Sequence, residues 1–396
     1  MKIEIFSKVS QSLFNTGGNM ANTYMIEPDL GFIREVEGLG GGDLKKCFQC
    51  ATCSVACPIS PDNKPFPRKE MIAASWGLKD KLVANYDIWL CHNCGDCSTL
   101  CPRGAKPGDV LGAIRSYAIA DYATPKALGK AINDPKKLPF LLAIPVVIFI
   151  VLGLITGFLN FNPGGGEIVH AHFFSTWLVD LIFIPLTVWI IAIFAMGLKR
   201  FLNDIHENAL LTGKTDKKEL EIGGFIQGLI RVIPRILLHR QFNECSDNKD
   251  RATAHLLVLY SFISLFIVTN IFFFTLYVLQ VHGPYSQMNP VKWLANIAGL
   301  ALIVGSILLI KNRLAKTDQV SSYVDWYLLG LVLGLGLTGL GTEITRLLGW
   351  AFVSYWLYFI HLVFVFMLFA FLPFSKMAHL VYRTVAMAYG EYTKRA

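Results

Sequence analysis

The cysteines of this chain are concentrated in two short runs that share one spacing. Eight of the nine fall between residues 47 and 101, and a proline follows the last cysteine of each run. The two runs are Cys47-x2-Cys50-x2-Cys53-x3-Cys57 and Cys91-x2-Cys94-x2-Cys97-x3-Cys101. Three thiolates so close in sequence can wrap one face of an iron–sulfur cubane, and the fourth ligand must approach from elsewhere. The spacing therefore predicts two [4Fe–4S] clusters.

The two runs resemble those of the bacterial two-cluster ferredoxins. This resemblance implies that the last cysteine of each run binds the cluster of the other run. One cluster would then be held by Cys47, Cys50, Cys53 and Cys101. The second would be held by Cys91, Cys94, Cys97 and Cys57. Two zinc sites are the alternative, but zinc sites normally pair two Cys-x2-Cys units at a longer separation. Cys245 stands alone and is interpreted as an ordinary loop thiol.

Three histidines in the apolar half of the chain have positions that suit haem ligation. His361 and His379 are 18 residues apart, which in one continuous helix places them on the same side and ~27 Å apart along the axis. His255 begins an apolar stretch at the depth of His379, so we predict that this pair binds one b-type haem and that His361 binds a second. The alternative is an interfacial residue at a helix end. It is weakest for His361, because ionisable residues inside apolar spans usually have a function.

Membrane helices must position these histidines, and the composition predicts such helices. Hydrophobic residues make up 54% of the 396 and charged residues only 16%, and the mean hydropathy of +0.47 is too high for a soluble globule of this size. Six apolar stretches are each long enough to cross the ~30 Å hydrocarbon core of a bilayer. They cover 138–160, 172–199, 254–280, 292–311, 324–346 and 351–374.

The connecting segments alternate in positive charge. The segment 199–251 contains ten Lys and Arg, whereas 161–171 and 281–291 contain none. The positive-inside rule therefore places both termini and the cysteine runs on the cytoplasmic side. Topology explains the formal charge of +8, so we predict no nucleic-acid partner. No apolar secretory signal is visible in residues 1–45, which favours a reducing compartment and metal binding over disulfides.

We predict a mainly α protein with three zones. An N-terminal segment, 1–45, ends in a glycine-rich stretch interpreted as a flexible linker. A helical two-cluster ferredoxin domain follows over 46–130, and a six-helix transmembrane cytochrome b bundle covers 138–390. The cytoplasmic loop 202–252 has apolar residues at helical spacing. This spacing predicts an amphipathic helix that lies on the membrane, on a partner or on the protein's own surface.

Two family resemblances support this division of the chain. Residues 40–130 resemble the cysteine domain of the heterodisulfide reductase C subunit, a helical ferredoxin type. The stretch from His361 through Pro373-Phe374-Ser375 to His379 resembles the last helix of the nitrate reductase gamma subunit family of cytochromes b. The second resemblance implies two b haems, with these two histidines on opposite sides of the membrane.

The resemblance leaves the second ligand of the His361 haem open. The other haem helix of that family offers two histidines ten residues apart, and this chain retains the first as His255 but has Leu265 at the second position. We favour His172, because an extra pair of helices could replace the lost ligand. His170 and His282 are the other candidates, and a five-coordinate haem is a further alternative.

The combined domains resemble the membrane-bound C subunit of the quinone-interacting membrane-bound oxidoreductase of sulfate reducers, over about residues 40–390. The resemblance implies electron exchange with menaquinol in the bacterial cytoplasmic membrane. It also implies two soluble flavin and iron–sulfur partners related to the heterodisulfide reductase A subunit, and a path to adenylylsulfate reductase. The quinone site would lie near His361, where Asp180 could relay protons. Glu343 and Arg346 could serve the same region or simply pair with each other.

The predicted function is electron transfer from menaquinol, through two b haems and two [4Fe–4S] clusters, to cytoplasmic partners in dissimilatory sulfate reduction. One alternative is the membrane component of a heterodisulfide reductase-like or other menaquinol-linked reductase. A second is a membrane anchor whose clusters serve assembly or redox sensing, which predicts no haem reduction by quinol. Reduction potentials depend on the surroundings of each cofactor, so spacing does not give the direction of flow.

Overall fold

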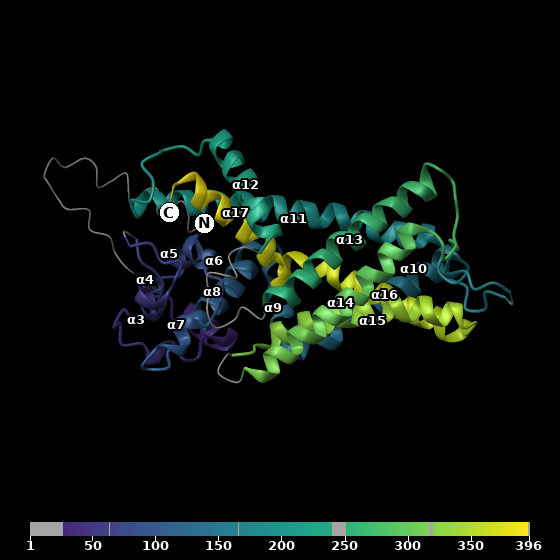
Figure 1. Ribbon diagram of the computed structural model, residues 1–396, viewed down its shortest axis with the longest axis horizontal. Coiled ribbons are helices and arrows are strands. Elements are labelled where there is room, and N and C mark those ends of the chain that lie inside the picture. The colour runs from purple at the N-terminus through teal and green to yellow at the C-terminus, as the bar shows by residue number, and fades with distance from the viewer. Residues whose placement is uncertain (1–26, 63, 165, 240–250, 317–319, 395–396) are drawn as a thin grey trace, which may run out of the picture.

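A computed structural model describes residues 27–62, 64–164, 166–239, 251–316 and 320–394 of the chain. Cys245 lies outside these ranges. The described residues are mainly α-helical, as predicted, and they contain no strand beyond one isolated bridge between Leu159 and Phe174. The molecule is elongated: short helices that carry the cysteines form one end, and long apolar helices extend away from them (Figure 1).

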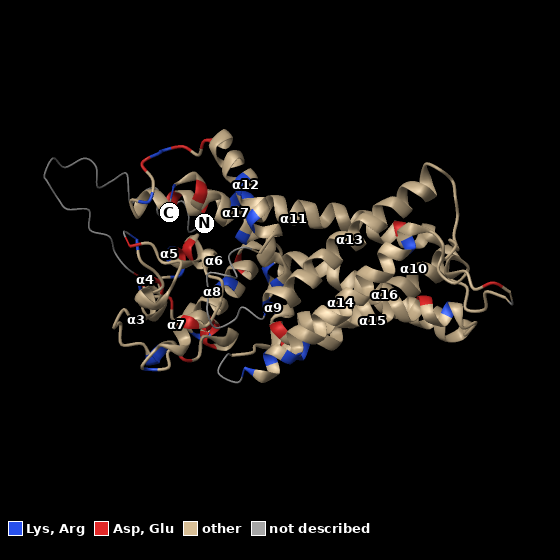
Figure 2. Cartoon of the chain, in the orientation of Figure 1, with Lys and Arg blue, Asp and Glu red and all other residues tan. Residues whose placement is uncertain are grey.

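Six helices are long and apolar enough to cross a membrane, which confirms that part of the prediction. They are α10 (Leu138–Thr156), α11 (Thr176–Leu211), α13 (Arg251–Tyr277), α14 (Pro290–Ala315), α15 (Tyr323–Leu347) and α16 (Ala351–Phe371). Figure 2 shows few charged residues along the middle of these helices. Helices α13 to α16 pack in sequence order, each against the next.

Short helices surround the cysteines at the other end of the molecule. They are α2 (Leu30–Val36), α3 (Thr52–Ala56), α4 (Arg68–Ser75), α5 (Lys79–Val83), α6 (Asp87–Leu90), α7 (Asp96–Thr99), α8 (Pro107–Tyr122) and α9 (Lys126–Ile132). The glycine-rich stretch is not the linker that its composition predicts. Residues Glu37–Gly41 continue α2 as a widened helical turn that packs on α8, and Gly41 lies so close to Val36 that a Cβ there would meet its side chain at 2.8 Å.

The hydrophobic core of the cysteine domain continues into the ends of two long helices. Trp89 of α6 packs against Phe201 of α11 and Tyr382 of α17 (His379–Tyr392), with ring centroids 5.8 and 5.5 Å apart. All three side chains are buried in one cluster. Helix α11 therefore runs well past its predicted end at residue 199, because its last turns are covered by the cysteine domain. The shared core fixes that domain against the bundle.

The last apolar stretch is not one continuous helix, and that part of the prediction was wrong. Helix α16 ends at Phe371, two 3-10 turns follow over 372–378, and α17 begins at His379. Pro373 has no N–H to continue the helical hydrogen bonds. Ser375 takes up an extended backbone (φ −95°, ψ 172°), and its side chain accepts from the Met377 N–H. The helical repeat therefore does not relate His361 to His379.

The segment between α11 and α13 contains the expected amphipathic helix, α12 (Ile222–Leu237). One face packs on α17, where Gly228 and Val232 are buried. On the opposite face Ile226 and Ile230 are 47% and 63% exposed. The helix thus packs on the protein's own surface with one side and leaves a second apolar side uncovered in this chain.

Candidate functional site

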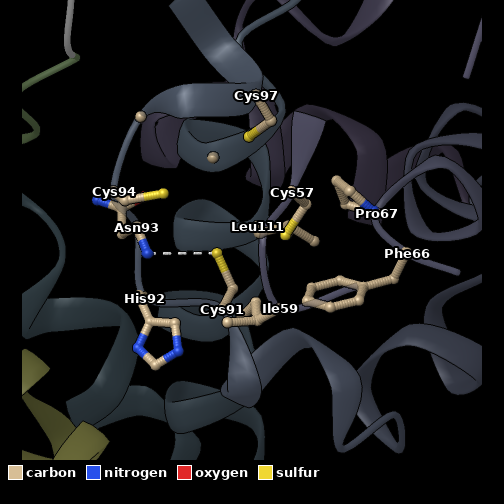
Figure 3. Close-up of a pocket in the computed structure, with 12 residues that line it drawn as sticks. Cys57, Ile59, Phe66, Pro67, Cys91, His92, Asn93, Cys94, Cys97 and Leu111 are labelled. Carbon is tan, nitrogen blue, oxygen red and sulfur yellow. Dashed lines mark hydrogen bonds between the residues drawn. The ribbon is translucent and has the colours of Figure 1, made fainter. Parts of the chain in front are cut away.

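The eight clustered cysteines converge in two groups of four, and each group lines its own cavity. One cavity is lined by Cys47, Cys50, Cys53 and Cys101. The other is lined by Cys57, Cys91, Cys94 and Cys97. In the second group the four sulfur atoms turn toward a common space (Figure 3). The grouping matches the predicted exchange of the last cysteine between the two runs.

Left-handed backbone residues bend each run around its cavity. Gln49 and Ala51 have φ of 60° and 70° in the first run, and Asn93 has φ of 52° in the second. The bends bring polar hydrogens to sulfur: the Asn93 N–H donates to Cys91 Sγ at 3.3 Å, and the Ala105 N–H donates to Cys101 Sγ at 3.4 Å. Hydrogen bonds of this kind stabilise thiolates and tune the potential of a bound cluster.

Burial opposes free thiolates in both cavities. It raises the pKa of Cys53 to about 11, with Cys47 and Cys50 adding to the effect. It raises the pKa of Cys57 to about 12. The exposed Cys50 is the opposite case, because a hydrogen bond with Thr52 lowers its pKa. Four thiolates gathered around one small cavity need bound positive charge, and metal coordination supplies it and deprotonates the thiols outright.

The donor sets fit iron–sulfur clusters. Each cavity offers four sulfurs, which is the full ligand set of a [4Fe–4S] cubane. Among the described residues no three His, Cys, Asp or Glu side chains converge closely enough to hold a single metal ion. A cubane does not require that convergence, because its four thiolates bind four different irons.

A third, larger cavity lies between the cysteine domain and the bundle. His255 at the start of α13 and His379 at the start of α17 both line it. As bounded by the described residues, its volume is about 230 Å³, and it is partly open to solvent. Its wall has a net positive charge: Asp325 pairs with Arg313 and Lys376, and the other basic residues are Arg115, Arg251, Lys316 and Arg383. We call it the histidine cavity.

Hydrogen bonds define the tautomer of each cavity histidine. The Nδ1–H of His379 donates to Lys376 O at 2.5 Å. The Nδ1–H of His239 donates to Ile236 O at 2.7 Å, and burial lowers the pKa of His239, so its ring is neutral and Nε2 accepts. His255 Nδ1 lies 2.7 Å from that Nε2 and must donate to it. Both His255 and His379 therefore have the lone pair on Nε2, as haem ligation requires.

His361 lies within α16, away from the cysteine domain, and has the same tautomer. Its Nδ1 is 2.9 Å from Thr338 Oγ1, whose own hydrogen bonds Gly334 O at 2.7 Å. The threonine oxygen must therefore accept from Nδ1–H, which leaves the lone pair on Nε2. Gly339 of α15 allows the ring to approach closely, because a Cβ there would lie 3.1 Å from His361 Cε1.

No hydrogen bond or ring contact joins the candidate partners to His361 within the described residues. His172, the favoured candidate, is exposed, and so is His282, whose Nδ1 bonds Gln280 O. His170 is half-buried, with Nε2 at 2.9 Å from Ser354 Oγ and its ring 4.9 Å from that of Tyr358. Both contacts of His170 are on α16, the helix of His361, so His170 is the best placed of the three.

At the end of the bundle away from the cysteine domain, the candidate polar residues are hydrogen-bonded or ion-paired. Asp180 of α11 accepts a hydrogen bond from the Tyr277 hydroxyl. Glu343 pairs with Arg346 at 3.1 Å and also with Lys292. The mutual ion pair that was the simpler interpretation of Glu343 and Arg346 is therefore present, and Lys292 extends it.

Sequence reasoning missed His92, which lies between two cavities. Residues 91–93 line both the cavity of Cys57, Cys91, Cys94 and Cys97 and the histidine cavity. Arg383 Nη2 donates to His92 Nδ1 at 2.9 Å. Burial, with Arg383 and Arg115, lowers the pKa of His92 to about 3, so the ring accepts as a neutral base. Its position next to Cys91 in the sequence could have identified it as a candidate. Nothing in the sequence identifies His239 and Thr338, because only the fold brings them to His255 and His361.

We name the two cysteine cavities by this shared wall. The proximal cysteine cavity, with Cys57 and Cys91, adjoins the histidine cavity. The distal cysteine cavity, with Cys47 and Cys101, shares no lining residue with it.

Known proteins resemble this chain in two ways. A family model described as a 4Fe-4S dicluster domain matches residues 43–105. The C subunit of the H(2):CoB-CoM heterodisulfide,ferredoxin reductase of Methanothermobacter marburgensis is 36% identical over 105 residues, which cover 26% of this chain and 56% of the relative. A protein of Archaeoglobus profundus, described as like the heterodisulfide reductase C subunit, is 33% identical over 89 residues, or 22% of this chain and 47% of the relative.

A third relative extends across both halves of the chain. Citrate utilization protein B of Escherichia coli is 24% identical over 373 residues, which cover 89% of this chain and 91% of the relative. No solved structure matches. The chain spans about half the length of the heterodisulfide reductase relatives, and the likeness to them is confined to the N-terminal part. The chain therefore contains a 4Fe-4S dicluster domain with homology to the heterodisulfide reductase C subunit, which supports an iron–sulfur electron-transfer role.

Proposed function

We propose that this chain is the electron-transfer subunit of a membrane oxidoreductase that oxidises menaquinol and delivers the electrons to cytoplasmic partner proteins. It would use two b haems and two [4Fe–4S] clusters, which supply one-electron steps between a two-electron donor and the partners. One observation carries the proposal: residues 91–93 form a wall common to the proximal cysteine cavity and the histidine cavity. Two sites lined by candidate cofactor ligands are thus adjacent, with one shell of protein between them.

We assign Cys47, Cys50, Cys53 and Cys101 to one cluster and Cys57, Cys91, Cys94 and Cys97 to the other, and the common lining of each cavity supports this assignment. Cys101→Ser should then perturb the cluster of the first run, and Cys57→Ser the cluster of the second. Electron paramagnetic resonance of each variant distinguishes the two. Loss of the second-run signal in Cys101→Ser would contradict the exchange, and stoichiometric zinc without labile sulfide would contradict both clusters.

We assign His255 and His379 to one haem in the histidine cavity. The Nε2 lone pairs of both rings and the net positive charge of the wall support this, because excess cations would offset the two propionates of a haem. His239 and Lys376 O hold the two imidazoles in the required tautomers.

We assign His361 to a second haem at the far end of the bundle, with the Thr338 hydrogen bond in its support. Its partner would be His172 or, on its position beside α16, His170; His282 is the third candidate. A menaquinol near this end must release protons as well as electrons, and Asp180 would receive one through its contact with Tyr277. The quinone pocket itself is assigned to no residues beyond this pair.

The partners and the pathway follow from family resemblance. A membrane component like that of the quinone-interacting membrane-bound oxidoreductase would sit in the bacterial cytoplasmic membrane with its cysteine domain in the cytoplasm. It would serve two flavin and iron–sulfur proteins related to the heterodisulfide reductase A subunit, and through them adenylylsulfate reductase. Homology to the heterodisulfide reductase C subunit supports a partnership with other reductase subunits. A heterodisulfide reductase-like or other menaquinol-linked reductase is the alternative assembly.

The similarity to citrate utilization protein B favours a second candidate function, because it alone among the relatives described covers both the cysteine domain and the bundle. In that case the same electron path would serve citrate utilization. The co-purifying proteins distinguish the two candidates.

The decisive experiment is a potentiometric haem titration of the purified complex, combined with reduction by a menaquinol analogue and identification of the proteins that co-purify. We expect two b haems that the quinol reduces. Absence of haem, or haem that the quinol does not reduce, would contradict the proposal. It would favour a membrane anchor whose clusters serve assembly or redox sensing.

A further inference from the structure

The two cysteine cavities have different surroundings. The proximal cavity adjoins the histidine cavity. The distal one is lined within the cysteine domain by residues 47–53, Arg68, Cys101, Arg103, Ala105 and Pro107. The distal cavity contains Cys50, which is exposed. Helices α3 and α7, which carry this region, lie at the end of the molecule away from α10 and α16 (Figure 1). In the proposed electron path, the distal cavity is therefore the site remote from the histidine cavity, and its exposed Cys50 places it at the surface.

Large apolar side chains are exposed around the distal cavity. Phe48 is 68% exposed, Val55 is 87% exposed and Leu100 is 59% exposed. Phe48 directly follows Cys47, Leu100 directly precedes Cys101, and Val55 lies between the last two cysteines of the first run. Helices α3 and α7 pack against each other, which brings the segments of Val55 and Leu100 together. Apolar side chains gathered outside the membrane spans mark an interaction surface.

The same surface carries positive charge. Arg68 and Arg103 line the distal cavity beside the cysteines. Arg68 Nε donates to Gln49 O at 3.0 Å, and the Arg103 guanidinium lies 4.0 Å from the centroid of the Phe48 ring. A carbonyl and an aromatic ring hold these cations in place without neutralising them. The surface therefore attracts an acidic partner.

We propose that this surface, the distal rim, docks a soluble electron-carrier protein whose redox centre is surrounded by acidic residues. The distal rim consists of Phe48, Val55, Leu100, Arg68 and Arg103. The proposal rests on the proposed function only in assigning a cluster to the distal cavity. A few apolar contacts in the centre with charges around them are typical of small, transient redox interfaces. The cations raise the rate of encounter, and the apolar side chains bring the two redox centres together.

A reduced plant-type [2Fe–2S] ferredoxin is a suitable probe, because it is a small acidic one-electron donor. The assay runs this exchange in the direction opposite to the proposed flow: one electron leaves the reduced centre of the ferredoxin and enters the cluster at the distal cavity, and no bond changes and no proton moves. The full chain, purified with its cofactors, is mixed with the reduced ferredoxin in a stopped-flow instrument. A parallel measurement gives the Kd of the oxidised ferredoxin, immobilised on a sensor surface.

Leu100→Glu and Leu30→Glu are a matched pair, because Leu30 is 62% exposed in the same domain but lies on α2, outside the distal rim. We expect Leu100→Glu to lower the second-order rate and weaken the Kd by about tenfold, since it adds repulsion at the centre of the surface. Val55→Glu should act in the same direction. Leu30→Glu should stay within about twofold of the parent protein, and the wild-type rate should fall steeply with salt.

The outcomes separate this proposal from the proposed function. Equal losses in Leu100→Glu and Leu30→Glu, or no loss in either, overturn the docking surface. Unchanged electron paramagnetic resonance signals of the clusters in Leu100→Glu show that the loss of rate and affinity comes from weaker docking. If quinol fails to reduce the haems while the ferredoxin results hold, the quinol-linked function is wrong and the docking surface stands.

Discussion

Histidines lie at both ends of the membrane bundle, but the two ends are built differently. Next to the cysteine domain, His255 and His379 come from different helices and line one large cationic cavity. At the far end His361 has a hydrogen bond to Thr338, and the best placed candidate partner, His170, is bonded to Ser354. Both ends fix the tautomer of their histidines. Within the part of the chain that the structure describes, two candidate ligands line one cavity at the near end but not at the far end.

The difference follows from how each end uses tertiary contacts. The near end can assemble a site because α16 breaks after Phe371 and α17 starts at His379, which frees that residue from the register of the spanning helix. The shared core around Trp89 then holds α17 against the cysteine domain. The far end depends on the packing of α15 and α16, where Gly339 allows His361 and Thr338 to meet. A ligand pair there requires a contribution from outside α15 and α16, either from the segment before α11 or from the loop between α13 and α14.

Removal of a ligand should separate the two ends most clearly. We expect His379→Leu and His361→Leu each to abolish one haem and leave the other, because the two residues serve different sites. Haem content per chain should fall by about half in each case. A pyridine haemochrome assay with low-temperature spectra measures this. Loss of both haems in His361→Leu, with the helices intact by circular dichroism, would mean that the ends are not independent.

Substitution of Asp180 should affect proton uptake during quinol oxidation at the far end of the bundle. Asp180→Asn retains the oxygen that accepts from Tyr277 but cannot receive a proton. We expect quinol oxidation to slow on the order of 10²-fold, with haem spectra unchanged and chemical reduction of the clusters unaffected. Stopped-flow kinetics with a menaquinol analogue give the rate. Unaltered kinetics would remove Asp180 from the mechanism.

Substitutions of the residues that accept hydrogen bonds from the ligand histidines test whether both ends orient their imidazoles in the same way. His239→Phe removes the acceptor for His255 Nδ1–H, and Thr338→Val removes the acceptor for His361 Nδ1–H. We expect each to weaken retention of its own haem by about 10–100-fold. Thr345→Val is the matched control, because the Thr345 hydroxyl donates to backbone carbonyls of α15. Competition with apomyoglobin measures haem loss, and an equal loss in Thr345→Val would assign the effect to helix packing.

The cationic wall should affect only the near end, and by a smaller amount. Lys316→Gln removes one charge from the histidine cavity, whereas Lys311→Gln removes an exposed charge from the neighbouring helix α14 outside it. A nearby cation stabilises an electron-rich cofactor, so Lys316→Gln should lower the potential of the near haem by about 50 mV. The far haem and the Lys311→Gln variant should shift by much less. Spectroelectrochemical titration resolves the two haems, and a shift of the far haem alone would reverse the assignment.

The sequence by itself determined the parts of this protein that depend on local pattern. The cysteine spacing predicted the cluster domain because ligands a few residues apart must fold around a common centre, and the structure gathers the eight thiols into the two expected sets. Length and hydropathy predicted six spans because a bilayer sets both quantities.

Only the tertiary structure decided what depends on contacts between distant segments. The ordered glycine turn at Glu37–Gly41 and the shared core with α11 arise from packing that no local pattern records. The same is true of His92 between two cavities, His239 against His255 and Thr338 against His361. A hydrogen-bond partner is chosen by proximity in space, and the chain separations here, up to 291 residues, are beyond the reach of spacing rules.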